Sequence, residues 1–229
     1  MVIAVDGPAG SGKSSVCRLL AKRTGCVYLD TGAMYRAVAW ALRRQGGNPD
    51  TLDDLDSFLS DLPLCFTIQD EALRIFYDRA PLEEELREPR IAEWASKVSR
   101  KGSVRELLTR WQRRLSRQGD VVAEGRDMTT VVFADTPFKI YLTADLAVRA
   151  ERRLRQHEGE GVFVSREELL EKIRQRDEAD ENRSLAPLRR APDAFFLDTS
   201  SLSVEEAVDR IREFVEARQK GLPRIDPKT

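Results

Sequence analysis

The sequence predicts an α/β fold in which a mainly parallel sheet is flanked by helices. Short apolar runs rich in β-favouring residues alternate with stretches of helical periodicity along most of the chain, an order that is typical of parallel sheets connected by helices. The first run leads through a glycine-rich turn directly into a helical pattern, whereas two runs within residues 64–77 follow each other without a helix. At 229 residues the chain suits one large domain, or a core that carries inserts.

The first strand, loop and helix together predict a nucleotide site. Residues 2–5 are apolar, residues 7–14 match G-x-x-x-x-G-K-[ST], and the apolar residues that follow have helical spacing. In this setting the glycines let backbone N–H groups converge on a polyphosphate, and the helix N-terminus adds positive partial charge. Lys13 would neutralise the β- and γ-phosphates, and the Ser14 hydroxyl would bind Mg²⁺. The alternative, an ordinary glycine-rich turn, is disfavoured by the full match in the expected setting.

Between residues 25 and 63 the sequence predicts one strand and two helices. Gly25 is suited to the end of the first helix, and residues 27–29 favour a second strand. Apolar spacing then indicates a helix that stops before the Gly-Gly-Asn-Pro at 46–49. Residues 51–54, from Thr to Asp, resemble a capping box in front of a further short helix.

A β-hairpin is predicted next. Residues 64–68 and 73–77 are β-favouring, and the polar residues 69–71 between them suit a turn. The second strand alternates apolar with polar side chains, so one of its faces should be covered. Because a hairpin interrupts the alternation of strands and helices, we expect an inserted subdomain here.

The rest of the chain returns to alternating strands and helices. Helical spacing covers residues 91–98 and 145–155, and residues 157–163, with two glycines among charges, favour a mobile loop. The tail from Gly221 is expected to fray. Strands are predicted at 121–123, 138–142 and 194–197. Three Ser-x-x-Glu patterns resemble helix starts, at Ser103 with Glu106, Ser165 with Glu168, and Ser203 with Glu206.

The balance of charges excludes some classes of partner. Lys and Arg number 38 against 39 Asp and Glu, which gives a net charge of −1 and argues against nucleic acid or an anionic membrane as the main partner. No apolar stretch approaches the length of a membrane span, and the N-terminus lacks the features of a signal peptide. We therefore expect a soluble, cytoplasmic protein.

Cysteine and histidine usage narrows the chemistry. Cys17, Cys26 and Cys65 have no C-x-x-C spacing, as expected of reduced structural thiols. The single histidine, His157, lies in a polar segment, which argues against histidine-based catalysis and a His-rich metal site. We expect catalysis to rest on positioning and on charge neutralisation by Lys13, Mg²⁺ and arginines.

Arginines beside the ends of elements are candidates for a second anion site. The chain has no N-K-x-D motif for guanine and lacks the length of a motor or transporter ATPase, so a small-molecule kinase remains. Its acceptor needs cations, and Arg36, Arg126 and Arg183 each stand next to a break between elements. Arg176, Asp180 and Arg183 share one helix face at spacings i, i+4 and i+7. Taken alone, this trio favours a weak ion-pair ladder on an exposed face.

A further arginine group precedes the glycine-containing loop, at positions 149, 152, 153 and 155. It fits an ordinary charged surface, or a mobile flap that closes over polyphosphate charge and excludes water. In the second interpretation Arg149 and Arg153 contact the ATP phosphates. The other predicted phosphate contacts are Gly7, Pro8, Ala9, Gly10, Ser11, Gly12, Lys13, Ser14 and Ser15.

Together these segments resemble bacterial cytidylate kinases, P-loop enzymes that phosphorylate CMP and dCMP with ATP. The phosphate loop alone is shared with many proteins, whereas D-T-G-A-M-Y-R and G-R-D together are specific to this family. The matching segments run in family order over nearly the whole chain. They are I-A-V-D-G-P-A-G-S-G-K-S-S, Y-L-D-T-G-A-M-Y-R, A-S-K-V-S, V-R-E-L-L, E-G-R-D-M-T-T-V-V-F, R-D-E-A-D-E-N-R and F-L-D-T-S.

The resemblance implies roles for the matching residues, and it makes the helix-face trio functional. Lys13, Arg126 and Arg183 are expected to be catalytic. Two positions depart from the family: Thr129 stands where Gly is usual, and Ser14-Ser15 replaces a common Gly-Thr, so Ser15 is a second Mg²⁺ candidate. The implied CMP contacts are Arg36, Arg126 and Arg183 at the phosphate, Ser96, Arg105 and Asp127 at cytosine, Arg176 and Asp180 at the sugar, and Asp30 and Thr31 lining the same site.

The resemblance also implies a P-loop NTPase-type domain over residues 1–229, with a monophosphate-binding insert that contains a small antiparallel sheet, and with a mobile lid. The core would comprise 1–35, 104–148 and 185–229, the insert 36–103 and the lid 149–184. The expected reaction transfers the ATP γ-phosphoryl group to CMP or dCMP with Mg²⁺, in a monomer without nucleic-acid or membrane partners. The alternatives are a P-loop kinase for UMP or another small acceptor, and a nucleotide-dependent switch or RNA-binding NTPase.

Overall fold

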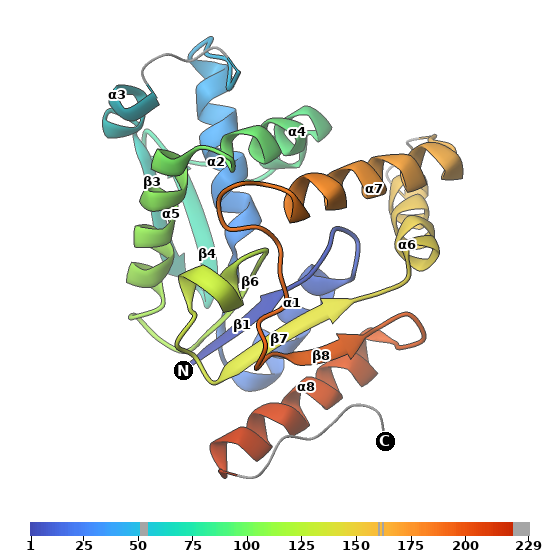
Figure 1. Ribbon diagram of the computed structural model, residues 1–229. Helices are drawn as coiled ribbons and strands as arrows, with labels where there is room; N and C mark the ends of the chain where they lie inside the picture. The colour runs from blue at the N-terminus through green and yellow to red at the C-terminus, as the bar shows by residue number, and fades with distance from the viewer. Residues whose placement is uncertain (51–54, 160, 162, 222–229) are drawn as a thin grey trace. The chain divides into compact units, whose positions relative to one another are not determined.

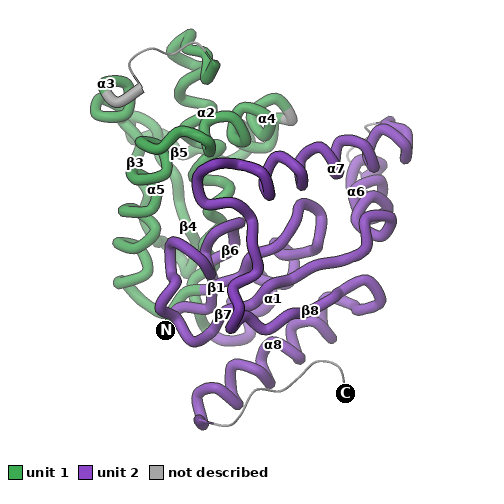
Figure 2. The backbone as a smooth tube through the Cα atoms, in the orientation of Figure 1, with its two compact units in different colours: residues 1, 25–121 green, residues 2–24, 122–229 purple. Residues whose placement is uncertain are grey.

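The computed structural model describes residues 1–50, 55–159, 161 and 163–221, and it confirms the predicted α/β fold with a mainly parallel sheet and flanking helices (Figure 1). The chain divides into two compact units (Figure 2). Unit 1 contains residue 1 and residues 25–121, and unit 2 contains residues 2–24 and 122–229.

Unit 2 carries the phosphate loop and most of the parallel sheet. Its strands lie in the order β6-β1-β7-β8, and both the β1–β7 and the β7–β8 pairs are parallel. The strands are β1 (Val2–Asp6), β6 (Val121–Gly125), β7 (Phe138–Thr143) and β8 (Phe195–Asp198). The helices are α1 (Lys13–Thr24), α6 (Leu146–Gly159), α7 (Arg166–Glu181) and α8 (Val204–Gln219), with a π-helical turn η2 (Met128–Val132) after β6.

The core of unit 2 follows from continuous apolar strands. Ile3, Ala4 and Val5 of β1 are fully buried, as expected of a parallel strand covered on both faces. Helices α1 and α8 pack against each other and bury Leu20 and Ile211. Each such aliphatic side chain contributes roughly 1.5–3 kcal/mol relative to exposure, so the strand that leads into the phosphate loop is held rigidly.

Unit 1 contains the predicted hairpin. Strands β3 (Leu64–Gln69) and β4 (Ala72–Tyr77) are antiparallel, with Phe66 opposite Ile75. The two turn residues between them, Asp70 and Glu71, have φ of +51° and +57°, the left-handed geometry of tight two-residue hairpin turns. β4 also pairs in parallel with β2 (Val27–Asp30) and antiparallel with a short strand that the sequence did not reveal, β5 (Ala80–Pro81).

Helices α2 and α5 of unit 1 pack against the hairpin strands. α2 and α4 pack against each other, and α5 contacts β3, where Trp111 meets Phe66 edge-on with ring centroids 5.5 Å apart. The helices are α2 (Thr31–Arg44), α3 (Leu55–Ser60), the 3₁₀ turn η1 (Glu85–Arg87), α4 (Pro89–Val98) and α5 (Gly102–Leu115).

Two local predictions are wrong. Helix α5 begins at Gly102 after an extended Lys101, so Ser103 lies inside the first turn and caps nothing. Residues 157–159 belong to α6, because helical hydrogen bonding continues as far as Gly159. By contrast, the caps at Ser165 and Ser203 are confirmed. The predicted capping box at 51–54 and the predicted fraying tail beyond residue 221 lie outside the described residues.

All three cysteines are free thiols, with Cys17 and Cys26 buried and Cys65 exposed. None of the helices in the described part of the chain combines the length and the apolar character needed to cross a bilayer.

Candidate active site

The phosphate loop joins the end of β1 to the start of α1, as predicted. A Cβ atom at Gly7 would lie 1.9 Å from the backbone oxygen of Leu142, so the close approach of β7 requires glycine there. Gly10 and Gly12 have φ of +74° and +88°, which glycine adopts at little cost. These constraints hold the loop in a shape that a chain of larger residues would not take.

Lys13 lies folded onto this loop. Its Nζ donates to the backbone oxygen of Pro8 at 2.6 Å and to Ser11 Oγ at 3.3 Å, and only 5% of the residue is exposed. Burial, together with the positive charge of Arg126, lowers the pKa of Lys13 to about 7, against the opposing charge of Glu124. An anionic phosphate beside Nζ would favour the charged form again.

Ser14 and Ser15 lie exposed in the first turn of α1. Their hydroxyls suit Mg²⁺, which takes few protein ligands and keeps water and phosphate oxygens in its shell. Among the described residues no three or more His, Cys, Asp or Glu side chains cluster in a way that would hold a metal ion. The serine hydroxyls are thus of a kind that fits Mg²⁺.

Arg149 contacts the loop from α6. It donates from Nε to the Ala144 oxygen at 2.9 Å and from NH1 to the Ala9 oxygen at 3.0 Å, and it forms an ion pair with Asp177 of α7. Asp177 also accepts from the Ala9 backbone N–H at 3.2 Å. One carboxylate of α7 thus contacts both the loop and its arginine.

The structure does not bring the other predicted flap residue to the loop. Arg153 is exposed and donates to Gln156 on its own helix at 2.7 Å. Its neighbour Arg152 does reach the loop. Arg152 NH2 donates to the backbone oxygen of Thr199 at 2.6 Å, and NH1 donates to the backbone oxygen of Ser11 at 3.5 Å. Spacing alone did not distinguish these adjacent arginines.

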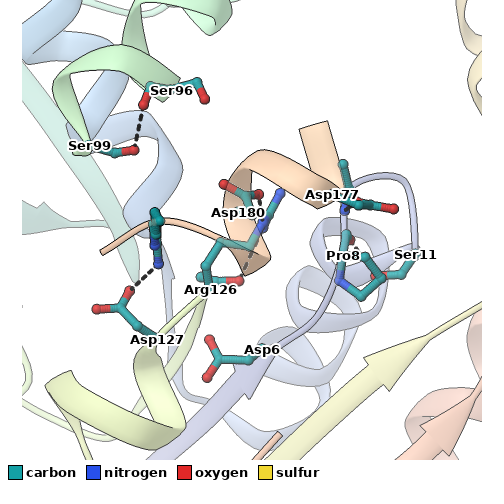
Figure 3. A network of polar contacts seen from close by, with 12 residues as sticks. Asp6, Pro8, Ser11, Ser96, Ser99, Arg126, Asp127, Asp177 and Asp180 are labelled. Atoms are coloured by element: carbon teal, nitrogen blue, oxygen red, sulfur yellow. Dashed lines mark hydrogen bonds and ion pairs between the residues drawn. The ribbon is translucent and has the colours of Figure 1, made fainter. Parts of the chain in front are cut away.

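A second cluster of charges in unit 2 contains the predicted acceptor residues. Arg126 Nε donates to Asp180 Oδ2 at 2.8 Å (Figure 3). Arg183 NH2 lies 3.8 Å from Asp127 Oδ1. Burial alone would raise the pKa of Asp180, but the charges of Arg126, Arg176 and Arg183 hold it below its ordinary value. These contacts contradict the interpretation of the trio as an exposed ladder, because Asp180 and the side chain of Arg183 are buried, although Arg176 is exposed. The prediction that all three residues share one helix face is also wrong, since α7 ends at Glu181 and Arg183 lies beyond it.

The predicted residues of unit 1 form their own contacts. Asp30 caps α2: its Oδ1 accepts from the Ala33 N–H and its Oδ2 from Arg36 NH2, both at 2.9 Å. Arg105, 7% exposed, donates to the Ser99 oxygen at 3.1 Å. Thr31 is the buried first residue of α2, and the backbone oxygen of Ser96, in α4, accepts from the Ser99 hydroxyl at 2.8 Å.

Sequence reasoning missed three carboxylates of unit 2. Asp6 ends β1 and is fully buried, Glu124 near the end of β6 is 5% exposed and acts electrostatically on Lys13 and Arg126, and Asp177 contacts the phosphate loop. A carboxylate at the C-terminal end of a buried strand was a usable signal for Asp6 and Glu124. Nothing in the polar run around Asp177 singled it out.

Comparison with known proteins identifies the family. The cytidylate kinase family model matches residues 3–217. A cytidylate kinase from Geobacter sulfurreducens is 39% identical over 97% of this chain and 96% of its own. A bifunctional pantoate ligase/cytidylate kinase from Synechococcus sp. is 43% identical over 92% of this chain, which spans only 39% of that protein. An uncharacterized protein from Eubacterium ventriosum shares the fold at 15% identity, with a TM-score of 0.52 over 95% of this chain and 99% of that one. The chain belongs to the cytidylate kinase family.

Proposed function

We propose that this chain transfers the γ-phosphoryl group of ATP to CMP or dCMP, which gives ADP and CDP or dCDP. Two features of unit 2 carry the proposal: a complete phosphate loop, and a separate, largely buried cluster of paired arginines and carboxylates. The chain also matches the cytidylate kinase family over residues 3–217. Family members named above act as kinases on cytidylate, which supports the choice of acceptor.

The phosphate loop is the donor site of this proposal. Backbone N–H groups of residues 7–15, Pro8 excepted, surround the ATP phosphates, and Lys13 and Arg149 neutralise their charge. Arg153, which lies away from the loop in this structure, joins them only when the proposed lid closes. Lys13 leaves its contact with the Pro8 oxygen and turns to the nucleotide. Because Arg149 is already held by the Ala9 oxygen and Asp177, little reorganisation is needed there.

The arginines of this cluster serve the acceptor. Arg126 and Arg183 bind its phosphate, Asp127 faces the cytosine, and Arg176 and Asp180 contact the sugar. Arginine suits this role because its planar fork pairs with two phosphate oxygens at once. The proposal extends to unit 1, where the acceptor contacts are Asp30, Thr31, Arg36, Ser96 and Arg105. Residues 36–103 and 149–184 keep their proposed roles as insert and lid.

The transfer needs no side-chain nucleophile. An oxygen of the acceptor phosphate attacks the γ-phosphorus, the bond from that phosphorus to the β,γ-bridging oxygen breaks, and ADP leaves with the electron pair. Lys13 and the arginines stabilise the charge as it moves between these oxygens. Mg²⁺ bound with the nucleotide at Ser14, or at Ser15, would offset charge on the β- and γ-phosphates.

Comparing CMP, dCMP and UMP as acceptors in one coupled ADP-release assay tests the proposal. We expect CMP or dCMP to exceed UMP in kcat/KM by at least about tenfold, since an unmatched buried polar group costs roughly 1–3 kcal/mol. Preferred turnover of UMP, or turnover only with a non-nucleotide acceptor, would reject the proposal in favour of its nearest rival.

The remaining parts of the proposal have separate checks. Omission of Mg²⁺ should abolish turnover, and light scattering should give the mass of a monomer. A cytoplasmic location is proposed with them, to be checked by cell fractionation. RNA titration at moderate salt addresses the alternative of a nucleotide-dependent RNA-binding protein, for which we expect no binding.

A further inference from the structure

The carboxylate of Asp6 joins the start of the phosphate loop to the turn after β6. Asp6 is fully buried and stands directly before Gly7. Its Oδ1 accepts from the Met128 N–H at 2.9 Å, and its Oδ2 accepts from both the N–H and the hydroxyl of Thr129, each at 2.7 Å. All three donors therefore come from two consecutive residues of η2.

These donors follow immediately on Arg126 and Asp127. The Asp127 backbone oxygen in turn accepts from the N–H groups of Val131 and Val132, at 2.9 and 3.1 Å. These hydrogen bonds connect Asp127 to the end of η2. A shift of η2 away from Asp6 would carry Arg126 and Asp127 with it. Small displacements of this kind are costly where a reacting group must be aligned.

We propose that Thr129 is a positioning residue for phosphoryl transfer. Its hydroxyl binds Asp6, and this bond holds the turn that contains Arg126 and Asp127 in a fixed position relative to the start of the phosphate loop. The inference rests on the proposed function, in which the loop holds the donor and this turn holds the acceptor. Thr129 touches neither substrate and acts through Asp6.

The electrostatics of Asp6 indicate what the Thr129 hydroxyl contributes in this chain. Burial, with a smaller contribution from the charge of Asp127, raises the pKa of Asp6 to about 6, although the hydrogen bonds from Thr129 and Met128 act to lower it. The other groups that feel its charge are Lys13 of α1, Arg126 and Tyr141 of β7. A protonated carboxyl group has less acceptor capacity and lacks the negative charge, so it holds these three donors more weakly. Loss of the Thr129 hydroxyl removes one stabilising bond and favours protonation.

The neighbouring threonine is a matched control. The Thr130 hydroxyl is buried on the same turn and has no hydrogen-bond partner among the described residues. Thr129→Val and Thr130→Val thus make the same chemical change one residue apart. Thr129→Ser keeps the hydroxyl and should restore wild-type behaviour.

The test is the pH dependence of kcat from pH 5 to 9, with saturating substrates. For Thr129→Val we expect the acid limb to move up by about one pH unit, since a hydrogen bond to a charged group is worth about one pKa unit or more. kcat should then fall several-fold near pH 6 and stay close to wild type near pH 8.5. Thr130→Val and Thr129→Ser should follow the wild-type profile. Ionisation of the substrates affects every profile equally, because the same substrates are used with all variants, so it does not contribute to the differences between them.

A carboxyl ¹³C titration of Asp6 by NMR accompanies the kinetics and needs no turnover. An Asp6 pKa that rises in Thr129→Val without movement of the acid limb would overturn the positioning role, and so would a loss of kcat that is equal at every pH. If the Asp6 pKa is the same in Thr129→Val as in wild type, the inference that the Thr129 hydroxyl acts on Asp6 is overturned. If the wild type does not phosphorylate CMP, the proposed function fails, and the Asp6 titration still decides whether Thr129 controls this carboxylate.

Discussion

Asp177 accepts a hydrogen bond from the backbone N–H of Ala9 at 3.2 Å, although 168 residues separate them in the sequence. The other oxygen of the same carboxylate pairs with Arg149, whose guanidinium also donates to the Ala9 oxygen. The Asp177 carboxylate is therefore hydrogen-bonded to a backbone N–H of a loop whose N–H groups suit phosphate. A polyphosphate bound at the loop would lie close to the negative charge of Asp177 as well as to the positive charge of Arg149.

Asp177→Asn tests this relationship. The amide keeps an oxygen for the Ala9 N–H but loses the charge that holds Arg149, so we expect kcat to fall about tenfold, equal to roughly 1.4 kcal/mol. The KM for ATP should not rise, because a negative charge near the phosphates is removed. Glu178→Gln, an exposed change one residue further along α7, is the control and should match wild type. A raised KM for ATP with unchanged kcat would contradict this account.

Lys13 should take up a proton when ATP binds. Its pKa of about 7 in the nucleotide-free protein leaves it mostly neutral at pH 8, and the phosphates favour the charged form. Calorimetric titration with ATP at pH 8, in two buffers of different ionisation enthalpy, should therefore show uptake approaching one proton, and uptake close to zero at pH 6. Lys13→Met should show none, with kcat lowered on the order of 10³-fold. Equal uptake in both proteins would assign the proton elsewhere.

Local signals in the sequence account for what could be predicted. The phosphate loop is a contiguous motif, and the hairpin follows from alternation around a polar turn. The Ser103 cap failed because Ser-x-x-Glu reports a helix start only when the serine itself is extended, and here Lys101 is the extended residue. The contacts of Asp177 with Ala9 and of Asp6 with Thr129 join residues 168 and 123 positions apart, so no local pattern reveals them.

Gln112 offers a way to stabilise the chain. It continues the buried stripe of α5 that includes Leu108 and Leu115, and it is fully buried, yet neither end of its amide has a hydrogen-bond partner among the described residues. An unsatisfied buried polar group costs roughly 1–3 kcal/mol, so Gln112→Met, of similar volume, should raise the free energy of unfolding by about that amount. Gln118→Met, at an exposed position, should change it by less than about 0.5 kcal/mol. Urea denaturation measures both; equal stabilities would mean that the Gln112 amide is satisfied in solution.

Asp180→Asn should destabilise the protein in a pH-dependent manner. The pKa of Asp180 lies below its ordinary value in the folded chain, so the carboxylate adds stability above its unfolded pKa of about 3.9. This contribution is lost as the pH falls through the lower folded pKa. Unfolding free energies of wild type and variant should therefore differ at pH 7 and converge in strong acid. A gap that is independent of pH would show that lost packing, and not charge, explains the effect.

Asp127 tests how the acceptor base is chosen. Cytosine presents an N4 amino donor where uracil presents an O4 acceptor, so a carboxylate at that edge accepts from cytosine and repels uracil. Asp127 is buried, at 2% exposure, which makes an unmatched charge costly. In Asp127→Asn the amide can offer its NH₂ to O4. We expect CMP turnover to fall, UMP turnover to fall less or to rise, and the ratio of their kcat/KM values to shrink at least about tenfold.

The competing role for Asp127 is to orient an arginine. Its Oδ1 lies 3.8 Å from Arg183 NH2, while Arg126 is paired with Asp180, so the arginine in question is Arg183. In that role Asp127→Asn would weaken CMP and UMP alike, as Arg183→Ala should, because both monophosphates carry the phosphate that Arg183 binds. Measuring both variants with both acceptors separates the two roles. A CMP/UMP ratio that stays constant while activity falls in Asp127→Asn, in parallel with Arg183→Ala, would reject base reading and leave Asp127 as the residue that holds Arg183 in place.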